Sequence, residues 1–149
     1  MFNKGYIFLL FAMLSMSLGC SKNSDQDLIS MEDYIAENNI TLTTSTSSGL
    51  GLLITYPGGA NRPTISSQVT VKYTGYLTSG EVFDDGGGNP ITFPLRNVIL
   101  GWQEGIPYFG TGGKGTLFIP SNLAYGSRGT GSIPPNADLI FDIELIDFQ

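Results

Sequence analysis

Alternating apolar and polar side chains recur along the chain from residue 50 onward. The alternation covers residues 50–56, 69–74, 117–119 and 139–145, with glycine and proline between these stretches. A period of two places successive side chains on opposite faces of a strand, so we predict half-buried strands with antiparallel connections. The predicted inward-facing side chains are Leu52, Ile54, Tyr56, Val69, Val71, Tyr73, Leu117, Ile119, Leu139, Phe141, Ile143 and Leu145.

Two other stretches have the period of a helix. Residues 98–106 predict a short helix that Pro107 ends, and residues 28–38 predict an amphipathic helix with Asp27 as its N-cap. Because the first of these helices stands amid several strands, we predict an α+β fold, with a curved antiparallel sheet wrapped around one short helix. The apolar face of that helix consists of Val98, Ile99, Trp102 and Ile106.

The N-terminus has the pattern of a secretory signal. Lys4 precedes an apolar run over residues 6–14, and small residues lead to Cys20, although Ser17 departs from the usual lipoprotein signal. We predict a signal peptide over residues 1–19 and lipidation of Cys20, which would anchor the protein in a bacterial cell envelope. The outer membrane is favoured, on its periplasmic or surface face. The alternative is an ordinary signal peptide followed by an incidental cysteine.

The predicted mature chain divides into two parts. Residues 20–49 begin with small polar residues and read as a tether that contains the first predicted helix. Residues 50–149 carry the strand patterns and form one predicted domain. We take a monomer as the default. Without Cys20 no cysteine remains for a disulfide, so this domain depends on core packing for its stability.

Composition excludes several classes of chemistry. The 149 residues include no histidine and one cysteine, which removes histidine-dependent nucleophiles and the usual zinc ligand sets. The formal net charge is −6 and the seven basic residues are scattered, a pattern unfavourable for binding nucleic acid. We therefore expect no metal, no cofactor and no nucleic-acid partner.

The stretch EVFDDGGGNPITF over residues 81–93 admits several readings. A calcium loop lacks the further spaced carboxylates, and Asp84 and Asp85 are adjacent, so in a strand they would face opposite ways. This geometry disfavours a carboxylate pair for acid–base catalysis. The glycines of FGTGGKGT lack the spacing of a phosphate-binding loop, and we expect a loop with Lys114 solvated. We therefore read residues 81–93 as one wall of a binding pocket.

Several segments together resemble the FKBP-type peptidyl-prolyl cis–trans isomerases, over about residues 50–148. They occur in the family's order and at compatible spacing. The segments are VKYTGYL, GEVFDD, VILGWQEGI, IPSNLAYG and SIPPNADLIFDIELI. The resemblance implies a sheet of five or six strands around a short helix, and rotation about the peptide bond before proline. It also implies proline-containing polypeptide substrates and binding of macrolide inhibitors.

The resemblance assigns roles to particular residues. Trp102 would form the floor of the pocket and aromatic residues its sides. The Ile99 N–H and the Tyr125 hydroxyl would bind carbonyl groups, and Asp84 would lie beside the twisting amide. The implied catalytic residues are Tyr73, Phe83, Asp84, Ile99, Trp102, Tyr125 and Phe141, and the implied substrate-binding residues are Ile91, Val98, Ala124 and Ile133.

The chain departs from the family next to Asp84. Well-known members carry a longer segment there, with an arginine that supports the carboxylate, whereas this chain has three consecutive glycines at 86–88 and no arginine before Phe93. We expect activity with an altered orientation of Asp84 and weaker macrolide binding. Taken singly, Trp102, Phe141 and Tyr73 would more often be core residues than site residues, and only their combination favours a site. The functional alternatives are a non-catalytic module or chaperone that binds proline-containing peptides, and a scaffold in an envelope complex.

Overall fold

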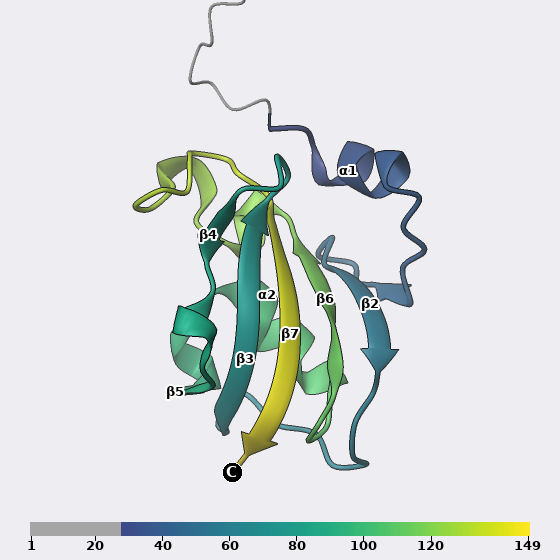
Figure 1. Ribbon diagram of the computed structural model, residues 1–149, viewed down its shortest axis with the longest axis vertical. Helices are drawn as coiled ribbons and strands as arrows, with labels where there is room; N and C mark the ends of the chain where they lie inside the picture. Colours follow the sequence, from purple (N-terminus) through teal and green to yellow (C-terminus); the bar gives the residue numbers. More distant parts are fainter. Residues whose placement is uncertain (1–27) are drawn as a thin grey trace, which may run out of the picture.

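The structure, a computed structural model, describes residues 28–149. A single antiparallel sheet has the strand order β1-β2-β6-β7-β3-β4, and β5 pairs with β3 beside β4. Figure 1 shows the long central strands β3 and β7 side by side. The strands are β1 (Thr44–Ser45), β2 (Gly51–Tyr56), β3 (Gln68–Leu77), β4 (Val82–Asp84), β5 (Ile91–Pro94), β6 (Lys114–Ile119) and β7 (Leu139–Phe148), and the helices are α1 (Met31–Glu37) and α2 (Leu100–Gly105).

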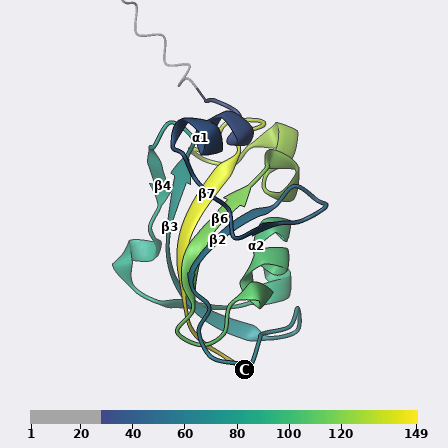
Figure 2. The same cartoon turned by 90° about the vertical axis from the view of Figure 1, so that its right-hand side faces the viewer.

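The predicted α+β architecture is confirmed. The sheet curves around α2, which lies on its concave side (Figure 2). The described strands number seven because the edge beside β3 is divided into β4 and β5 and because the two-residue β1 adds to the opposite edge. Division of that edge leaves a loop between β4 and β5, and this loop carries the three consecutive glycines.

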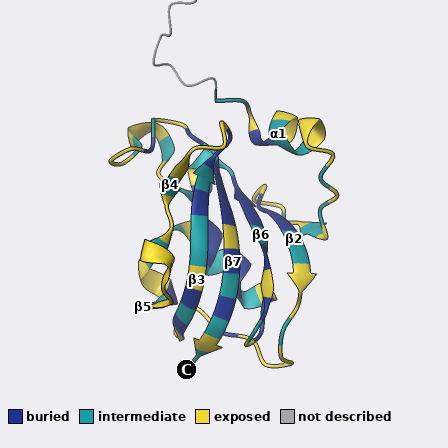
Figure 3. Ribbon diagram, viewed as in Figure 1, coloured by how far each residue is buried: buried dark blue, intermediate teal, exposed yellow. Residues whose placement is uncertain are grey.

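The main core fills the space between the sheet and α2. Buried residues form bands along β3, β6 and β7, as the period of two predicts (Figure 3). Those on the face toward α2 belong to one cluster of buried apolar side chains that includes Trp102 of α2. The members contributed by the strands are Leu52, Val69, Val71, Leu77, Leu117, Ile119, Leu139, Phe141, Ile143 and Leu145.

The prediction for Tyr56 is wrong. Its alternation with Leu52 and Ile54 places Tyr56 on the buried face, but 58% of the residue is exposed. The pairing of β2 with β6 shifts register between Ile54 and Tyr56. A bulge of this kind adds a residue to one strand and changes which face the following side chain occupies.

Helix α2 differs from the predicted helix at both ends. It begins at Leu100, with Ile99 as an N-cap in an extended conformation, and the chain continues past Gly105 as a 3₁₀ turn over Ile106–Tyr108. Pro107 therefore lies within this turn and does not end the helical segment. Proline fits there because the first turn of a helix leaves its N–H groups unpaired in any case.

Helix α1 begins later than predicted and covers the outer face of the sheet. Its N-cap is Ser30, whose side chain accepts a hydrogen bond from the Asp33 N–H, and the predicted cap Asp27 lies outside the described residues. Met31 packs with Phe118 and Ile140, which alternate along their strands with residues of the main core. Residues assigned to the tether therefore contact the sheet on the face opposite α2.

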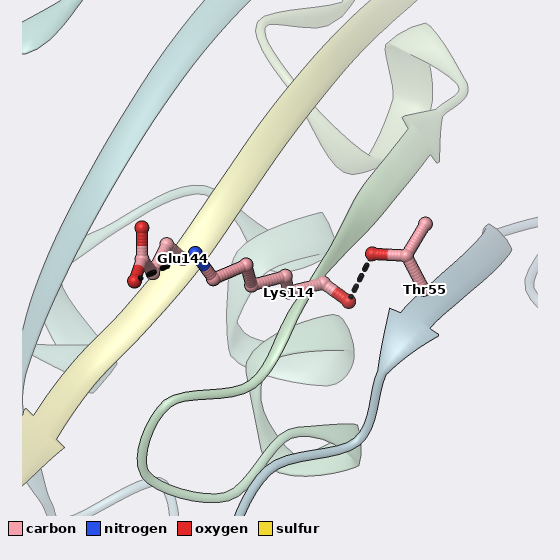
Figure 4. Close-up of polar contacts among 3 residues, drawn as sticks. All are labelled: Thr55, Lys114 and Glu144. Atoms are coloured by element: carbon pink, nitrogen blue, oxygen red, sulfur yellow. Dashed lines mark hydrogen bonds and ion pairs between the residues drawn. The ribbon is translucent and has the colours of Figure 1, made fainter.

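Lys114 is the first residue of β6, not part of a solvated loop. Its Nζ lies 3.1 Å from Oε1 of Glu144, and its carbonyl accepts a hydrogen bond of 3.0 Å from the Thr55 hydroxyl (Figure 4). The prediction of a loop at Lys114 is thus wrong, because cross-strand pairing places it in β6 directly opposite Glu144 on β7, whereas the predicted exposure of its side chain is confirmed at 54%. Such half-exposed pairs contribute little to stability, about 0–1 kcal/mol.

The predicted signal peptide and the lipidation of Cys20 lie outside the described residues and stay predictions. Within residues 28–149, neither helix is long and apolar enough to cross a membrane.

Candidate active site

A cavity of about 490 Å³ opens on the concave side of the sheet. Its residues come from β3, β4 and β5, from α2 and the segment leading into it, from β7 and from the chain after β6. These segments lie far apart in the sequence and meet only through the sheet pairing. The lining residues are Tyr73, Phe83, Asp84, Ile91, Phe93, Asn97, Val98, Ile99, Trp102, Tyr125 and Phe141.

Aromatic rings packed edge to face form the floor and walls. Trp102 is only 4% exposed, and its ring centroid lies 5.1 Å from that of Tyr73 and 5.2 Å from that of Phe141. Phe83 lies 5.4 Å from Phe141 in the same arrangement. Edge-to-face packing is the favoured geometry for aromatic pairs, so these rings hold one another in place. The result is a rigid apolar slot.

Gly75 allows the rings to lie close to β3. A Cβ atom at this position would lie 2.6 Å from Cζ of Phe83 and 2.8 Å from Cε1 of Phe141. Atoms cannot approach so closely, so any side chain at position 75 would displace both rings. The absence of a side chain on β3 therefore determines the width of the slot.

The polar groups of the cavity gather around Asp84. Its Oδ2 accepts a hydrogen bond of 2.6 Å from the Tyr73 hydroxyl, and its Oδ1 accepts one of 3.0 Å from the Gly86 N–H. Asp85 does not line the cavity and instead accepts a hydrogen bond from the Gly87 N–H. The two adjacent carboxylates thus have separate surroundings, so they do not form an acid–base pair.

Both tyrosine hydroxyls of the cavity remain protonated at neutral pH. Burial raises the pKa of Tyr73, and the hydrogen bond to Asp84 and its charge raise it further. Burial, followed by the charge of Asp84, also raises the pKa of Tyr125. The proton of Tyr73 is committed to Asp84, whereas the Tyr125 hydroxyl has no partner within residues 28–149.

The entry to α2 supplies a backbone donor. Ile99 is extended, with φ −59° and ψ 151°, and its carbonyl accepts hydrogen bonds from the N–H groups of Trp102 and Gln103. The Ile99 N–H itself has no partner in the part of the chain that the structure describes. The Gln103 side chain donates to the Val98 carbonyl at 2.7 Å and fixes this segment.

The structure brings together all seven predicted catalytic residues, together with Ile91 and Val98. Ala124 and Ile133 do not line the cavity. Ala124 packs against the main core, and Ile133 is a core residue with 7% exposure whose N–H donates to the Thr130 carbonyl.

Sequence reasoning missed two residues that line the cavity, Phe93 and Asn97. Phe93 has a usable signal, because it alternates with Ile91 on β5. Asn97 ends a 3₁₀ turn and has no such signal.

Other candidate sites are weaker. Among residues 28–149, no three metal-binding side chains cluster. A second cavity of about 340 Å³ lies on the outer face of the sheet, between Tyr34 of α1 and Tyr76 of β3, and Asp142 is its only ionisable carboxylate. The cavity on the concave side combines the aromatic slot with several polar groups and is the candidate active site.

Comparison with known proteins agrees with this geometry. Residues 59–146 match the family described as FKBP-type peptidyl-prolyl cis-trans isomerase. The chain is 49% identical over 105 residues to the probable FkpA isomerase of Neisseria meningitidis, covering 68% of this chain and 39% of that protein. It is 43% identical over 132 residues to FkpA of Buchnera aphidicola from Schizaphis graminum, covering 86% of this chain and 52% of that protein.

Solved structures show the same similarity. FkpA from Escherichia coli superposes with a TM-score of 0.75 at 38% identity, over 80% of this chain and 57% of that one. A peptidyl-prolyl isomerase from Pseudomonas syringae gives a TM-score of 0.72 at 33% identity, over 80% of this chain and 90% of that one. The chain spans about half or less of the length of the curated relatives. Sequence, fold and cavity agree, and the chain belongs to the FKBP-type peptidyl-prolyl cis-trans isomerase family.

Proposed function

We propose that this protein accelerates rotation about Xaa-Pro peptide bonds. One observation carries the proposal: six aromatic side chains line a single cavity in which Asp84 is the only charged residue. Such a slot suits the flat, apolar ring of proline and contains no apparatus for breaking a covalent bond. The family of the chain supports the same activity.

The reaction needs only a preference for the twisted amide. The barrier of about 18–20 kcal/mol arises from resonance in the planar peptide bond, and uncatalysed exchange takes tens to hundreds of seconds. Twisting removes the resonance and reduces the charge separation across the amide. A site that binds the twisted form more tightly than the planar forms therefore accelerates the exchange. An apolar slot achieves this, since the planar amide is the more polar species.

The polar groups hold the polypeptide while the bond turns. Within residues 28–149, the Ile99 N–H and the Tyr125 hydroxyl are unpaired donors at the cavity, and each would donate a hydrogen bond to a substrate carbonyl. The buried Nε1–H of Trp102 is a third unpaired donor in the cavity lining. The Asp84 carboxylate lies at the rim, hydrogen-bonded to Tyr73, and would lie beside the rotating amide. Phe83, Trp102 and Phe141 would surround the proline ring.

The substrates and the cellular setting form a second part of the proposal. The signal pattern and Cys20 support a lipid-anchored protein in a bacterial envelope that acts on proline-containing exported polypeptides, with a monomer as the default. Residues 1–19 would be removed, residues 20–49 would connect the anchor, and residues 50–149 would form the isomerase domain. Macrolide inhibitors would occupy the same cavity, with reduced affinity because the loop after Asp84 is short.

Exchange of an Xaa-Pro peptide from cis to trans tests the proposal. We expect the parent to accelerate exchange, and Phe83→Ala to lower kcat/KM at least roughly tenfold, because loss of one wall opens the slot to water. Tyr125→Phe removes only the hydroxyl and isolates its contribution. Val82→Ala is the matched control, because Val82 neighbours Phe83 but is 50% exposed and does not line the cavity.

The alternative, a non-catalytic module that binds proline-containing peptides, gives a different result. Saturable peptide binding by a folded parent without acceleration would replace the isomerase proposal by that one. Normal activity of a folded Asp84→Ala variant would remove the role of this carboxylate alone.

A further inference from the structure

Among the described residues, Asp84 is the only charged one that lines the cavity, and it is oriented by two neutral hydrogen-bond donors and by no basic side chain. The single ion pair within residues 28–149 joins Lys114 to Glu144, so no basic side chain accompanies Asp84. Each carboxylate oxygen instead accepts one hydrogen bond: Oδ2 from the Tyr73 hydroxyl at 2.6 Å and Oδ1 from the Gly86 N–H at 3.0 Å. The two donors come from β3 and from the loop after β4.

Two donors restrict the carboxylate more than one. The terminal torsion of an aspartate is broad, so a single hydrogen bond leaves the group free to rock about the bond that carries it. Tyr73 is itself fixed by its contact with Trp102, with ring centroids 5.1 Å apart. Because the Gly86 N–H donates to the second oxygen, the orientation of the carboxylate plane toward the aromatic slot is fixed.

The backbone at Gly86 is suited to this contact. Its φ of +60° lies in the left-handed region, and a Cβ would lie 3.2 Å from Cδ1 of Ile91 and from Cε1 of Tyr73. Glycine adopts this φ without steric cost. The loop is closed by the Gly88 N–H, which donates to the Asp85 carbonyl at 3.0 Å.

We propose that Gly86 is a positioning residue of the active site, whose N–H orients the Asp84 carboxylate toward the substrate amide. The inference rests on the proposed isomerase function and deepens it: the glycine loop takes part in the reaction through Asp84. Gly86 is not a catalytic residue, because it lies outside the residues that line the cavity.

The chain contains a matched control one residue further on. The Gly87 N–H donates to Oδ1 of Asp85 at 2.8 Å, and Gly87 has a φ of +66°. This contact repeats the chemistry of the Gly86–Asp84 contact, but Asp85 does not line the cavity. If such contacts only stabilise the loop, loss of the N–H at position 86 and loss of the N–H at position 87 should have equal effects on kcat/KM.

The test deletes single N–H donors in the full chain. Replacing a glycine by glycolic acid converts its amide to an ester, which removes the N–H without adding a side chain. The ester is introduced at position 86, 87 or 88. The third variant is needed because an ester at 86 also weakens the Asp85 carbonyl, the acceptor of the Gly88 N–H. For each variant, kcat/KM for an Xaa-Pro peptide and the midpoint of urea unfolding are measured.

We expect the ester at 86 to lower kcat/KM roughly tenfold, the size of effect associated with a hydrogen bond to a charged group. The esters at 87 and 88 should stay within about twofold of the parent, with similar unfolding midpoints for all three. In an Asp84→Ala background, the ester at 86 should cause no further loss, since residues that act as a unit are not additive.

Equal losses at 86, 87 and 88 would overturn the proposal, and so would an undiminished effect in the Asp84→Ala background. Failure of the proposed function is distinct: the parent itself would then show no acceleration. If the variant with the ester at 86 does not fold, the substitutions Gly86→Ala and Gly88→Ala replace the esters at 86 and 88. Both positions have positive φ, but nothing lies within 4 Å of a Cβ at position 88. A loss of kcat/KM in Gly86→Ala, absent from Gly88→Ala and abolished in the Asp84→Ala background, supports the proposal. Equal losses in the two variants, or a loss in Gly86→Ala that persists in the Asp84→Ala background, overturn it.

Discussion

At the scale of single residues, the site contains two tyrosines, Tyr73 and Tyr125, whose pKa values are raised. Burial is the largest cause of the raised pKa of Tyr73, Tyr76 and Tyr125, and nearby carboxylates add to it. Tyr73 and Tyr125 both line the cavity, and their hydroxyls keep their protons over the whole physiological range, with that of Tyr73 donated to Asp84. The site therefore needs no titration near neutral pH, in keeping with a reaction that moves no proton.

The raised pKa values predict alkaline sensitivity of stability. The folded state holds these protons more tightly than the unfolded state, in which tyrosine has its ordinary pKa of 10.0. This contribution is fully present below that pH and is lost as pH rises through the folded pKa. We expect the free energy of unfolding to fall above about pH 10. Tyr73→Phe should make the fall shallower, as measured by urea unfolding across a pH series.

Tyr56→Phe provides the control for that experiment. Tyr56 is 58% exposed and lies far along the sheet from the cavity, at the end of β2, so its removal should leave the pH profile unchanged. A Tyr73→Phe profile that runs parallel to that of the parent would show that Tyr73 does not contribute to the alkaline loss.

At the scale of elements, close packing of α2 on the sheet positions the floor of the cavity. A Cβ at Gly101 would lie 2.4 Å from Cγ2 of Ile119 on β6. Alanine in place of glycine ordinarily stabilises a helix by about 1 kcal/mol. Overpacking a filled core costs about 1–3 kcal/mol, so the steric effect is the larger one here.

We therefore predict that Gly101→Ala lowers both stability and activity. The free energy of unfolding should fall by about 1 kcal/mol or more. The exchange rate should fall as well, because displacement of α2 moves Trp102 and the Ile99 N–H together. Urea unfolding and peptide exchange check the two effects. In combination with Ile119→Ala, the loss should be smaller than the sum of the two single losses, and strict additivity would contradict a direct clash.

Helix α1 contributes to stability from the other face of the sheet. Met31 is 4% exposed against Phe118 and Ile140, and its N–H donates to Asp138, whose second oxygen accepts from the Ser121 N–H. We predict that Met31→Ala lowers the free energy of unfolding by about 2 kcal/mol, through the cavity that it leaves. Activity under folding conditions should be unchanged, since none of these residues lines the active-site cavity.

The exposed neighbour Glu32 supplies the control for Met31→Ala. Glu32→Ala should change neither the unfolding curve nor the exchange rate by a measurable amount. Loss of activity in a Met31→Ala variant that keeps its stability would instead point to coupling between the outer face and the cavity.

At the scale of the whole molecule, residues 59–146 match the FKBP-type family and further residues precede that match. The chain covers 39–52% of the curated FkpA relatives but 90% of the Pseudomonas syringae isomerase. In the residues before that match, β1 pairs with β2 at the edge of the sheet and α1 packs on the outer face of the sheet. The proposed activity would therefore depend on the one cavity of this type among the described residues and on the elements that shape it.

The predicted anchor is testable on the whole chain. We expect the parent to fractionate with membranes of the producing bacterium and to incorporate a labelled fatty acid. Cys20→Ser should lose the label and leave the membrane fraction, because acyl chains supply about 0.8 kcal/mol for each buried methylene. Ser21→Ala is the control and should retain the label. Equal labelling of parent and Cys20→Ser would contradict lipidation at this residue.

The sequence by itself determined the longer strands and the class of fold, and its resemblance to the family indicated most members of the site. Period-two patterns depend only on which side chains are apolar, so they identified β3, β6 and β7 directly. The aromatic residues and the carboxylate of the site were identified because the motifs that carry them occur in the same order as in the family. The same local information does not distinguish a residue of the core from one that lines a cavity, because both are apolar and face the same way.

Tertiary structure decided what depends on distances between elements. A register shift placed Tyr56 in solvent, and strand pairing set Lys114 opposite Glu144. Packing buried Ile133 in the core but left Phe93 at the cavity. Of the two donors to Asp84, the Gly86 N–H lies only two residues away, whereas the Tyr73 hydroxyl reaches the carboxylate only after β3 and β4 have paired. Periodicity determines the face that a side chain occupies, whereas pairing and packing determine what it meets there.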